Sequence, residues 1–500
     1  MPVLAQFQGE HNASGFGVTM ESIDFNHDGY DDLVVWSQFY GYHYSDIPSR
    51  GKVYVYYGGP EFGSDTQAAM TLEGDYPLGE QMKISGILNC GDVNGDGFDD
   101  LGIRESFQIA SDSIKVLIYY GGVDNLDQPD YCIEHTEHFY VTPTFTQLGD
   151  VNNDGYDDIG YVYLESQVMW YKIIWGGDYS QTTVLSEQWD SANLGSLEGI
   201  GDVNNDGYYD FTIGNTHLNT YHNKILLYFG CLTPSFENPI TLMDTYNGIT
   251  TRCAKFGDVN GDGYEDFFFY ANSGGMRICY GGDTINYENP DVILNPVYYG
   301  NAYIRGLDSG DVNGDGYSDV IGASYSQQRF AVWLGNAVMD SDYDYRVVST
   351  YENFGKEVET GDFNGDGFCD VAVSAPYEDG TYPLHDYRGY VFVYGGNAGM
   401  VANEDELAPQ LTDKWSFSTF PNPLPMGKAV TLCYQGKGYE QLNTKTISLY
   451  NLKGQRVFQA QDSSRGDTSS ISLPELPSGV YIIKVSADGH RHSSKRIVVY

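Results

Sequence analysis

The sequence predicts an all-β protein, in which a seven-bladed β-propeller over residues 1–399 is followed by a small antiparallel β-sandwich over residues 416–500. Two observations carry this prediction. A nine-residue pattern, D-x-N-x-D-G-[YF]-x-D, recurs seven times along the first part of the chain. Glycine (60) and tyrosine (44) are also abundant among the 500 residues. This composition suits short strands joined by tight turns and is poor for helices.

Each copy of the pattern is followed by the signals of a propeller blade. The copies begin at residues 24, 92, 150, 202, 258, 311 and 362. A short β-prone run such as Leu33–Trp36 comes next, and a later strand ends on an aromatic or apolar residue and glycine, as in Tyr57-Gly58-Gly59. A unit of about fifty residues with several short strands and no helical period is typical of a blade.

The ends of the repeat region indicate how the ring closes. Val3–Phe7 precede the first copy as an isolated strand-like segment, whereas no such strand follows Gly396 after the last copy. A single blade cannot bury both faces of its sheet, so the units must stack. We therefore expect the N-terminal strand to complete the seventh blade.

The charge of the chain is distributed unevenly. The formal net charge is −43, yet residues 416–500 hold ten Lys and Arg against five Asp and Glu, so the negative charge lies on the first 415 residues. Such a field argues against nucleic acid or an anionic membrane surface as a partner. It also opposes a compact fold unless cations are bound.

The sequence predicts neither a membrane span nor a signal peptide, and its cysteines indicate little about the fold. No stretch approaches about 18 apolar residues, so no transmembrane span is expected. No basic-then-apolar signal peptide follows Met1, and export would imply an N-terminus that has been processed or re-engineered. The seven cysteines are scattered and predict no disulfide framework.

Each copy of the pattern carries oxygen ligands at positions 1, 3, 5 and 9, with a backbone carbonyl near position 7. This is the hard oxygen set that Ca²⁺ prefers, whereas Mg²⁺ requires a stricter octahedron and retains its waters. Glycine at position 6 supplies the sharp turn. About seven Ca²⁺ sites are therefore predicted.

Two other interpretations of the pattern were compared with calcium binding by a blade loop. An EF-hand needs a bidentate Glu at position 12, but that position is occupied by Val35, Ile103, Tyr161, Ile213, Phe269, Gly322 and Val373. Metal-free Asp-Gly hairpin turns are the second alternative. Turn geometry alone does not require four oxygen ligands in register, and seven copies retain all four.

These loops, together with Phe16-Gly17, Phe354-Gly355 and Ala375-Pro376, resemble FG-GAP repeats, which form the propeller blades of integrin α-subunits and of many bacterial surface proteins. The resemblance covers residues 1–400 and implies that each loop joins the first two strands of a blade and that a calcium ion fixes the hairpin. Three loops depart from it at position 4, where His27, Asn153 and Asn205 replace glycine.

The resemblance also implies the ligand set. The side-chain ligands would be Asp24, Asn26, Asp28 and Asp32; Asp92, Asn94, Asp96 and Asp100; Asp150, Asn152, Asp154 and Asp158; Asp202, Asn204, Asp206 and Asp210; Asp258, Asn260, Asp262 and Asp266; Asp311, Asn313, Asp315 and Asp319; and Asp362, Asn364, Asp366 and Asp370. The carbonyl ligands would be those of Tyr30, Phe98, Tyr156, Tyr208, Tyr264, Tyr317 and Phe368.

The C-terminal part has a different composition. Residues 400–415 are polar and contain Pro409, which predicts a linker. Alternating runs such as Thr446–Tyr450 and Val480–Val485 then predict the β-sandwich. A generic terminal adhesion module would also have these features.

The order of three motifs is more specific. Pro421-Asn422-Pro423, Leu449–Gln455 and Leu476–Ile482, followed by a basic and apolar end, resemble the C-terminal sorting domain of type IX secretion substrates. The resemblance implies recognition by the type IX secretion machinery and export to the outside or the outer-membrane surface of a Bacteroidota-like bacterium. Removal of the domain usually follows.

The loops opposite the calcium loops are the candidate ligand-binding surface. The two longest, Phe39–Asp46 and Tyr377–Arg388, belong to blades 1 and 7, which are neighbours across the ring closure. Tyr and His beside carboxylates suit recognition of a protein or glycan, although Tyr also fills half-buried positions in a Tyr-rich propeller. The candidate residues are Tyr40, Tyr42, His43, Tyr44, Tyr377, Tyr382, His385 and Tyr387.

The sequence therefore favours a non-enzymatic, secreted or surface-exposed adhesion or ligand-binding protein. It contains no G-x-S-x-G, H-E-x-x-H or P-loop pattern. A calcium-dependent enzyme that degrades extracellular polysaccharides is the alternative from another class, and a purely structural spacer is a third.

Overall fold

The computed structural model divides into two compact units, Met1–Asn403 and Glu404–Tyr500. It describes residues 1–10, 14–40, 49–74, 82–107, 114–123, 126–135, 144–165, 168–185, 189–190, 193–217, 222–232, 239–245, 252–270, 276–283, 285, 290–295, 306–376, 388–400, 415–420, 429–436, 445–451, 456–462, 468–474, 476–487 and 491–499. Within these ranges the first unit consists of strands and one short 3₁₀ turn, η1 (Tyr325–Gln327).

The described residues of the first unit form seven antiparallel sheets, which we call blades 1 to 7 in the order of the seven loops. The first strands of blades 1 to 7 are β2 (Phe16–Ile23), β6 (Met82–Gly91), β10 (Thr144–Gly149), β15 (Asn193–Gly201), β19 (Arg252–Gly257), β23 (Gly306–Gly310) and β27 (Val358–Gly361). The second strands are β3 (Asp32–Ser37), β7 (Asp100–Phe107), β11 (Asp158–Glu165), β16 (Asp210–His217), β20 (Asp266–Tyr270), β24 (Asp319–Ser324) and β28 (Asp370–Ala375).

The third and fourth strands complete each blade. The third strands are β4 (Lys52–Tyr56), β8 (Ile114–Tyr119), β12 (Val168–Ile174), β17 (His222–Tyr228), β21 (Met276–Cys279), β25 (Arg329–Trp333) and β29 (Tyr390–Tyr394). The fourth strands are β5 (Met70–Glu73), β9 (Tyr131–His135), β13 (Thr182–Val184), β18 (Ile240–Thr245), β22 (Val292–Leu294), β26 (Tyr345–Val348) and, in blade 7, β1 (Val3–Gln8). Blade 3 has an additional short strand, β14 (Trp189–Asp190), which pairs with β12.

The first strands contact one another in a closed cycle. β2 contacts β6, β6 contacts β10, and the series continues through β15, β19, β23 and β27 back to β2. A cycle of four-stranded antiparallel sheets whose first strands meet around a centre is a β-propeller. The predicted all-β propeller fold is therefore confirmed.

The hydrophobic core of the propeller lies between the blades. Each pair of neighbouring blades encloses one apolar cluster, so the clusters form a cycle as the blades do. Between blades 1 and 2, for example, Val34 and Trp36 share a cluster with Leu101 and Ile103. Both faces of a blade are covered in this way, and all six residues of β3 are buried. This is why the run after each loop is almost continuously apolar.

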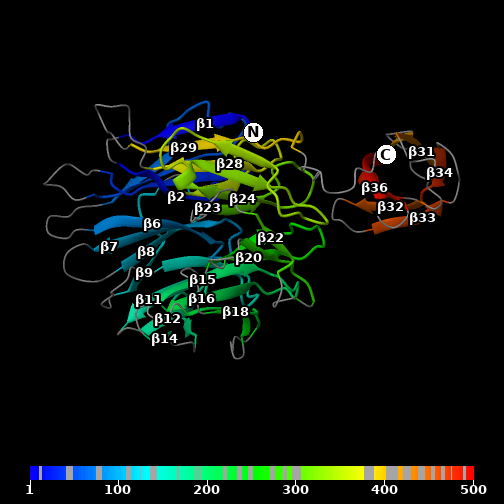
Figure 1. Cartoon of the computed structure of the whole chain (residues 1–500). Coiled ribbons are helices and arrows are strands. Elements are labelled where there is room, and N and C mark those ends of the chain that lie inside the picture. Colours follow the sequence, from blue (N-terminus) through cyan, green and yellow to red (C-terminus); the bar gives the residue numbers. More distant parts are fainter. Residues whose placement is uncertain are drawn as a thin grey trace. The chain divides into compact units, whose positions relative to one another are not determined.

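The N-terminal strand closes the ring. β1 pairs antiparallel with β29, with Phe7 opposite Val391, and Figure 1 shows blue β1 beside yellow β29. The Phe7 ring is buried, and its centroid lies 4.2 Å from that of Tyr56 in blade 1. We call this junction of blades 7 and 1 the closure seam.

The second unit is a β-sandwich, as predicted. One sheet contains β30 (Trp415–Phe420), β31 (Ala429–Gly436) and β34 (Thr468–Ser472). The other contains β33 (Arg456–Asp462), β32 (Lys445–Asn451), β35 (Gly479–Ala487) and β36 (Arg491–Val499). Side chains from both sheets, including Leu432 and Ile447, form one buried cluster.

The linker differs from its predicted bounds at both ends. Met400 is buried in the cluster between blades 6 and 7, so it belongs to the propeller. At the other end β30 begins at Trp415. Composition cannot show this, because one buried methionine does not change the polar character of the segment. Residues 401–414 lie outside the described residues.

The closure seam predicts the effect of truncating Phe7. Phe7→Ala should destabilise the propeller by about 3–5 kcal/mol, because it removes a fully buried ring. Equilibrium unfolding in denaturant measures the loss. Val3→Ala is the matched control, since Val3 lies on the same strand but is 57% exposed, and a change within about 0.5 kcal/mol is expected. Equal stability of the two variants would contradict a role for β1 in closing the ring.

Candidate functional site

All seven nine-residue loops join the first strand of a blade to the second, and the aspartate at position 9 is the first residue of the second strand. This aspartate is completely buried in every blade. The residues at positions 4, 5 and 6 are exposed in nearly every loop, so each loop extends from a buried anchor to an exposed tip.

The carboxylate at position 1 organises the exposed tip. In the first loop, Oδ1 of Asp24 accepts the N–H of Asp28 and its Oδ2 accepts the N–H of Gly29, both at 3.0 Å. The other six loops make the same two bonds. The glycine at position 6 has φ between 85° and 95° in all seven loops. There is open space around Gly29, so the left-handed backbone and not a lack of room requires glycine.

The buried carboxylate at position 9 joins three strands. Its Oδ1 accepts the N–H of the glycine that follows the third strand in all seven blades, at 2.7–3.0 Å. Its Oδ2 accepts the N–H of position 2 in five loops, at 2.8–3.1 Å. In the other two loops Oδ2 of Asp32 and of Asp370 has no hydrogen-bond partner among the described residues.

The glycine that follows the third strand explains why this strand is followed by an aromatic or apolar residue and glycine in the sequence. A Cβ on Gly58 would overlap the carbonyl oxygen of Asp31, and the corresponding glycine of each other blade meets the position 8 carbonyl in the same way. Only glycine lets the backbone come close enough for its N–H to reach the position 9 carboxylate.

Burial raises the pKa of these seven carboxyl groups. The pKa rises to about 7 for Asp32, Asp100, Asp266 and Asp370, and to about 8 for Asp158, Asp210 and Asp319. Backbone N–H donors oppose this rise, while the carboxylates at positions 1 and 5 reinforce it. A nearby cation would favour the ionised form of every one of these groups.

The donor set of each loop fits a calcium ion. The Asn94 amide nitrogen lies 2.9 Å from Oδ2 of Asp96 and 3.5 Å from Oδ1 of Asp100, so the side chains of positions 3, 5 and 9 converge. Among the described residues no three Asp, Glu, His or Cys side chains form a metal cluster by themselves. In this loop the asparagine amide stands between the two carboxylates.

The asparagine can present its oxygen without leaving a backbone N–H unpaired. Its Oδ1 accepts the N–H of Asp96, but that N–H also donates to Oδ1 of Asp92. Rotation of the amide would therefore leave the N–H bonded while turning an oxygen toward the two carboxylates. The resulting oxygens of positions 1, 3, 5 and 9 are the ligands that calcium prefers.

Two kinds of contact connect the loops of neighbouring blades around the ring. The position 2 carbonyl of each loop accepts an N–H from the segment after the third strand of the next blade, at 2.6–3.0 Å in all seven cases. The last of these bonds runs from Gly59 to Phe363 and crosses the closure seam. The loops thus hold adjacent blades together as well as their own strands.

The aromatic residue at position 7 makes the second contact. The Phe98 ring lies 4.2 Å from the ring of His27, at position 4 of the preceding loop. Where position 4 is glycine, a Cβ would overlap the next loop's aromatic ring, as at Gly95 with Tyr156 and at Gly365 with Tyr30. From the sequence alone, only the backbone carbonyl of these residues is expected to have a role. Position 7 is aromatic in every copy, and this is the feature of the sequence that could have indicated packing against a neighbouring loop.

The predicted ligand-binding residues fall largely outside the described residues. Tyr42, His43, Tyr44, Tyr377, Tyr382, His385 and Tyr387 all lie there. Tyr40 is described, and its hydroxyl donates to Oε1 of Glu73 at 3.1 Å. The Nζ of Lys52 lies 4.7 Å from the centre of the Tyr40 ring.

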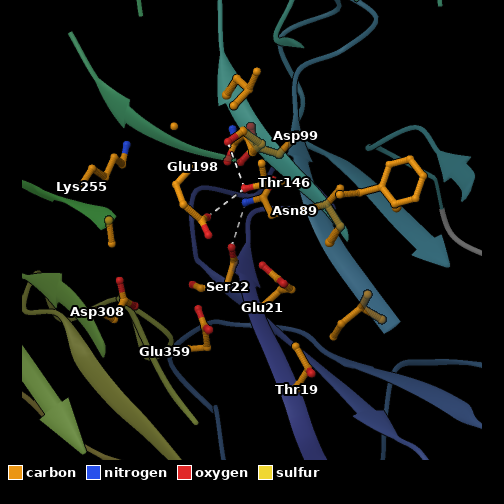
Figure 2. A pocket seen from close by; sticks show the side chains of 18 of the residues that line it. Thr19, Glu21, Ser22, Asn89, Asp99, Thr146, Glu198, Lys255, Asp308 and Glu359 are labelled. Carbon is orange, nitrogen blue, oxygen red and sulfur yellow. Dashed lines mark hydrogen bonds between the residues drawn. The ribbon is translucent and has the colours of Figure 1, made fainter. Parts of the chain in front are cut away.

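A cavity of about 900 Å³ lies between the first strands of all seven blades and forms the central channel. Figure 2 shows Glu21, Asp308 and Glu359 gathered on one side of it. Burial raises the pKa of Glu21 to about 8, an effect that the Asn89 N–H opposes and the carboxylates of Asp308 and Glu357 reinforce. Burial and the neighbouring carboxylates also raise the pKa of Glu359 well above its usual value.

The channel predicts a pH dependence of stability. The pKa of Glu21 is 4.5 in an unfolded chain and about 8 in the fold, so the folded state holds an extra proton between these values. Raising the pH through this window therefore lowers the free energy of unfolding. Glu21→Gln should make that energy less dependent on pH between about 5 and about 9, as measured by denaturant unfolding in saturating calcium.

The matched control for this prediction is Glu61→Gln, which changes an exposed glutamate outside the channel. It should retain the pH dependence of the unaltered protein. An unaltered dependence in Glu21→Gln as well would show that Glu21 does not titrate as its surroundings indicate.

Comparison with protein families finds matches in both parts of the chain. Residues 16–56 and 354–394 match the FG-GAP repeat, and residues 311–373 match an FG-GAP-like repeat. Residues 418–500 match a secretion system C-terminal sorting domain. The described part of the chain holds no helix with the length and apolar character needed to cross a bilayer.

Integrins are among the curated relatives. Integrin alpha-5 of Xenopus laevis is 30% identical over 166 residues, which is 31% of this chain. Integrin alpha-8 of Homo sapiens is 30% identical over 168 residues, which is 32% of this chain. The match spans only 15% of the length of each of these relatives.

Among solved structures, the Cps50 (Swd1) β-propeller domain of Myceliophteria thermophila aligns over 75% of this chain and 99% of its own, with a TM-score of 0.41 and 9% identity. The sorting domain marks the chain for secretion. The chain therefore contains a β-propeller with FG-GAP repeats, followed by a secretion system C-terminal sorting domain.

Proposed function

We propose that this chain is a calcium-binding adhesion or ligand-binding protein, which recognises a protein or glycan outside the cell or at the outer-membrane surface. The observation that carries the proposal is the presence, in one chain, of an FG-GAP propeller and a secretion sorting domain. The sorting domain would be recognised by the type IX secretion machinery. The propeller would be the part that acts after export.

Calcium would have a structural role in this function. The ligands would be the side chains of positions 1, 3, 5 and 9 and the carbonyl of position 7 in each loop. A bound ion supplies positive charge beside the buried position 9 carboxylate, whose pKa is raised to between about 7 and about 8. Because that carboxylate joins three strands, the ion would stabilise the corner of each blade.

The binding role rests on the architecture of the first unit. A propeller is a rigid ring that presents irregular loops of different length on one face, and binding residues are commonly found on such loops. The integrin relatives match this same repeat region. We therefore place ligand recognition on the propeller and not on the sorting domain.

Calcium removal should lower the thermal stability of the protein by a large amount. Each site contributes about 2.7 kcal/mol when free calcium is about 100 times its Kd, and about seven sites act together. Calorimetry in chelator and after addition of calcium measures the change, and magnesium should restore little of it.

Asp206→Ala, at position 5 of the fourth loop, should bind about one ion fewer.

Glu61→Ala is the control for the ion count, because it removes an exposed carboxylate that lies in no loop of the pattern. It should bind as many ions as the unaltered protein. A melting temperature that does not change in chelator would refute the calcium assignment.

A glycan array and a panel of extracellular matrix proteins, probed with the full chain, test the binding role. Binding that requires calcium is expected, since the loops that hold the blades together would need the ion. A parallel assay of lyase and hydrolase activity on polysaccharides gives the opposing outcome. Release of product would replace the adhesion proposal with an enzymatic one.

A further inference from the structure

The closure seam contains a polar pocket of about 490 Å³ outside the central channel. Its walls come from three places: the N-terminal segment that includes β1, the third strand of blade 1 (β4), and the segment leading into and including β5. Pockets that hold small ligands occupy about 300–1,000 Å³. The pocket is therefore large enough for one small molecule of hexose size.

The floor of the pocket is formed by β4. Lys52, Tyr54 and Tyr56 alternate along this strand, so they lie on the same face of the sheet. All three are buried, at 6%, 3% and 6% exposure. Gln67 and Thr71 line the pocket from the exposed side. Side chains with hydrogen-bonding groups make up nearly the whole lining.

The charge of Lys52 is already neutralised. Its Nζ lies 2.9 Å from Oε1 of Glu10 and 3.4 Å from Oε1 of Glu73. It also lies over the Tyr54 ring, 4.9 Å from the ring centre. The pocket therefore offers no free positive charge to a phosphate, sulfate or carboxylate, and this favours a neutral ligand.

The hydroxyl of Tyr54 gives the most specific indication. It is buried beside the Glu10 carboxylate, yet no hydrogen bond of acceptable geometry joins the two groups. Burial, followed by the negative charge of Glu10, raises the pKa of Tyr54, so the hydroxyl keeps its proton and can donate. Leaving such a group unpaired costs free energy. A ligand that accepts its hydrogen bond would recover that cost.

We propose that this pocket binds one neutral sugar residue. A sugar carries hydroxyl groups that both donate and accept, which matches a lining of tyrosine, threonine and amide groups beside the Glu10 carboxylate. The assignment rests on the proposed ligand-binding function and names its site and ligand class. The pocket lies at the seam that only the N-terminal strand can complete.

The test uses calcium-loaded full chain and saturation-transfer NMR with the methyl glycosides of glucose, galactose, mannose, fucose and N-acetylglucosamine. At least one of these probes should bind, and sulfate should not displace it. Tyr54→Phe should weaken binding about tenfold while the melting temperature stays the same or rises, because the lost hydroxyl makes no well-formed hydrogen bond in the fold. If Tyr54 had only a structural role, weaker sugar binding would be accompanied by a lower melting temperature.

Two further variants complete the design. Tyr228→Phe makes the same chemical change at the buried end of β17 in blade 4 and should leave sugar binding unchanged. Thr71→Trp, at an exposed position, should fill the pocket and abolish binding without unfolding the protein.

The proposal is overturned if none of the methyl glycosides binds, if sulfate displaces the sugar, or if Thr71→Trp binds as well as the unaltered chain. These outcomes leave the broader function separately testable. A Thr71→Trp protein that still binds the glycan array or a matrix protein would show that the ligand-binding function is correct and that its site lies elsewhere.

Discussion

In every blade a buried aspartate accepts the N–H of the glycine that follows the third strand, and in five blades it also accepts an N–H from its own loop. One carboxylate thus joins the first, second and third strands at a single corner. The neighbouring blade attaches to the same loop through the position 2 carbonyl. Sheet pairing, the loop and the contact between blades therefore meet at the corner that this residue holds.

This arrangement has an electrostatic cost. Seven carboxylates lie at complete burial, and further acidic groups line the central channel. Burial raises the pKa of the seven loop carboxyl groups and, in the channel, of Glu21 and Glu359, so the negative charge of the first unit opposes the fold that these same groups hold together. Divalent ions in the loops would offset the part of this cost that comes from the loop carboxylates. Because the ions would offset the charge of buried carboxylates, we propose that calcium has a structural role and not a catalytic one.

The closure seam differs from the other six junctions between blades. Elsewhere the four strands of a blade follow one another along the chain, whereas blade 7 takes its last strand from the N-terminus. Sequence symmetry is therefore broken at one place in a nearly symmetric ring. Pocket and seam coincide because the N-terminal segment carries side chains, such as Glu10, that are not part of the repeat.

The sequence alone determined the repeat, the propeller fold and the terminal sandwich, because these depend on a local motif and on strand periodicity. It also identified the residues of every loop. What it could not determine were contacts between residues distant in the chain. The aromatic ring at position 7 packs on the preceding loop, Met400 belongs to the propeller, and Gly59 bonds to Phe363 across the seam.

The seam pocket and the acidic channel also depend on residues that are distant in the chain. Glu21 and Glu359 are far apart in the sequence and meet only because seven first strands surround one axis. In the sequence Tyr54 resembles any buried tyrosine, and only the structure shows that its hydroxyl lies beside Glu10 without a well-formed hydrogen bond. Local patterns encode how each blade is built, whereas burial, pairing and cavities arise only when the ring closes. Tertiary structure therefore decided where a ligand could bind.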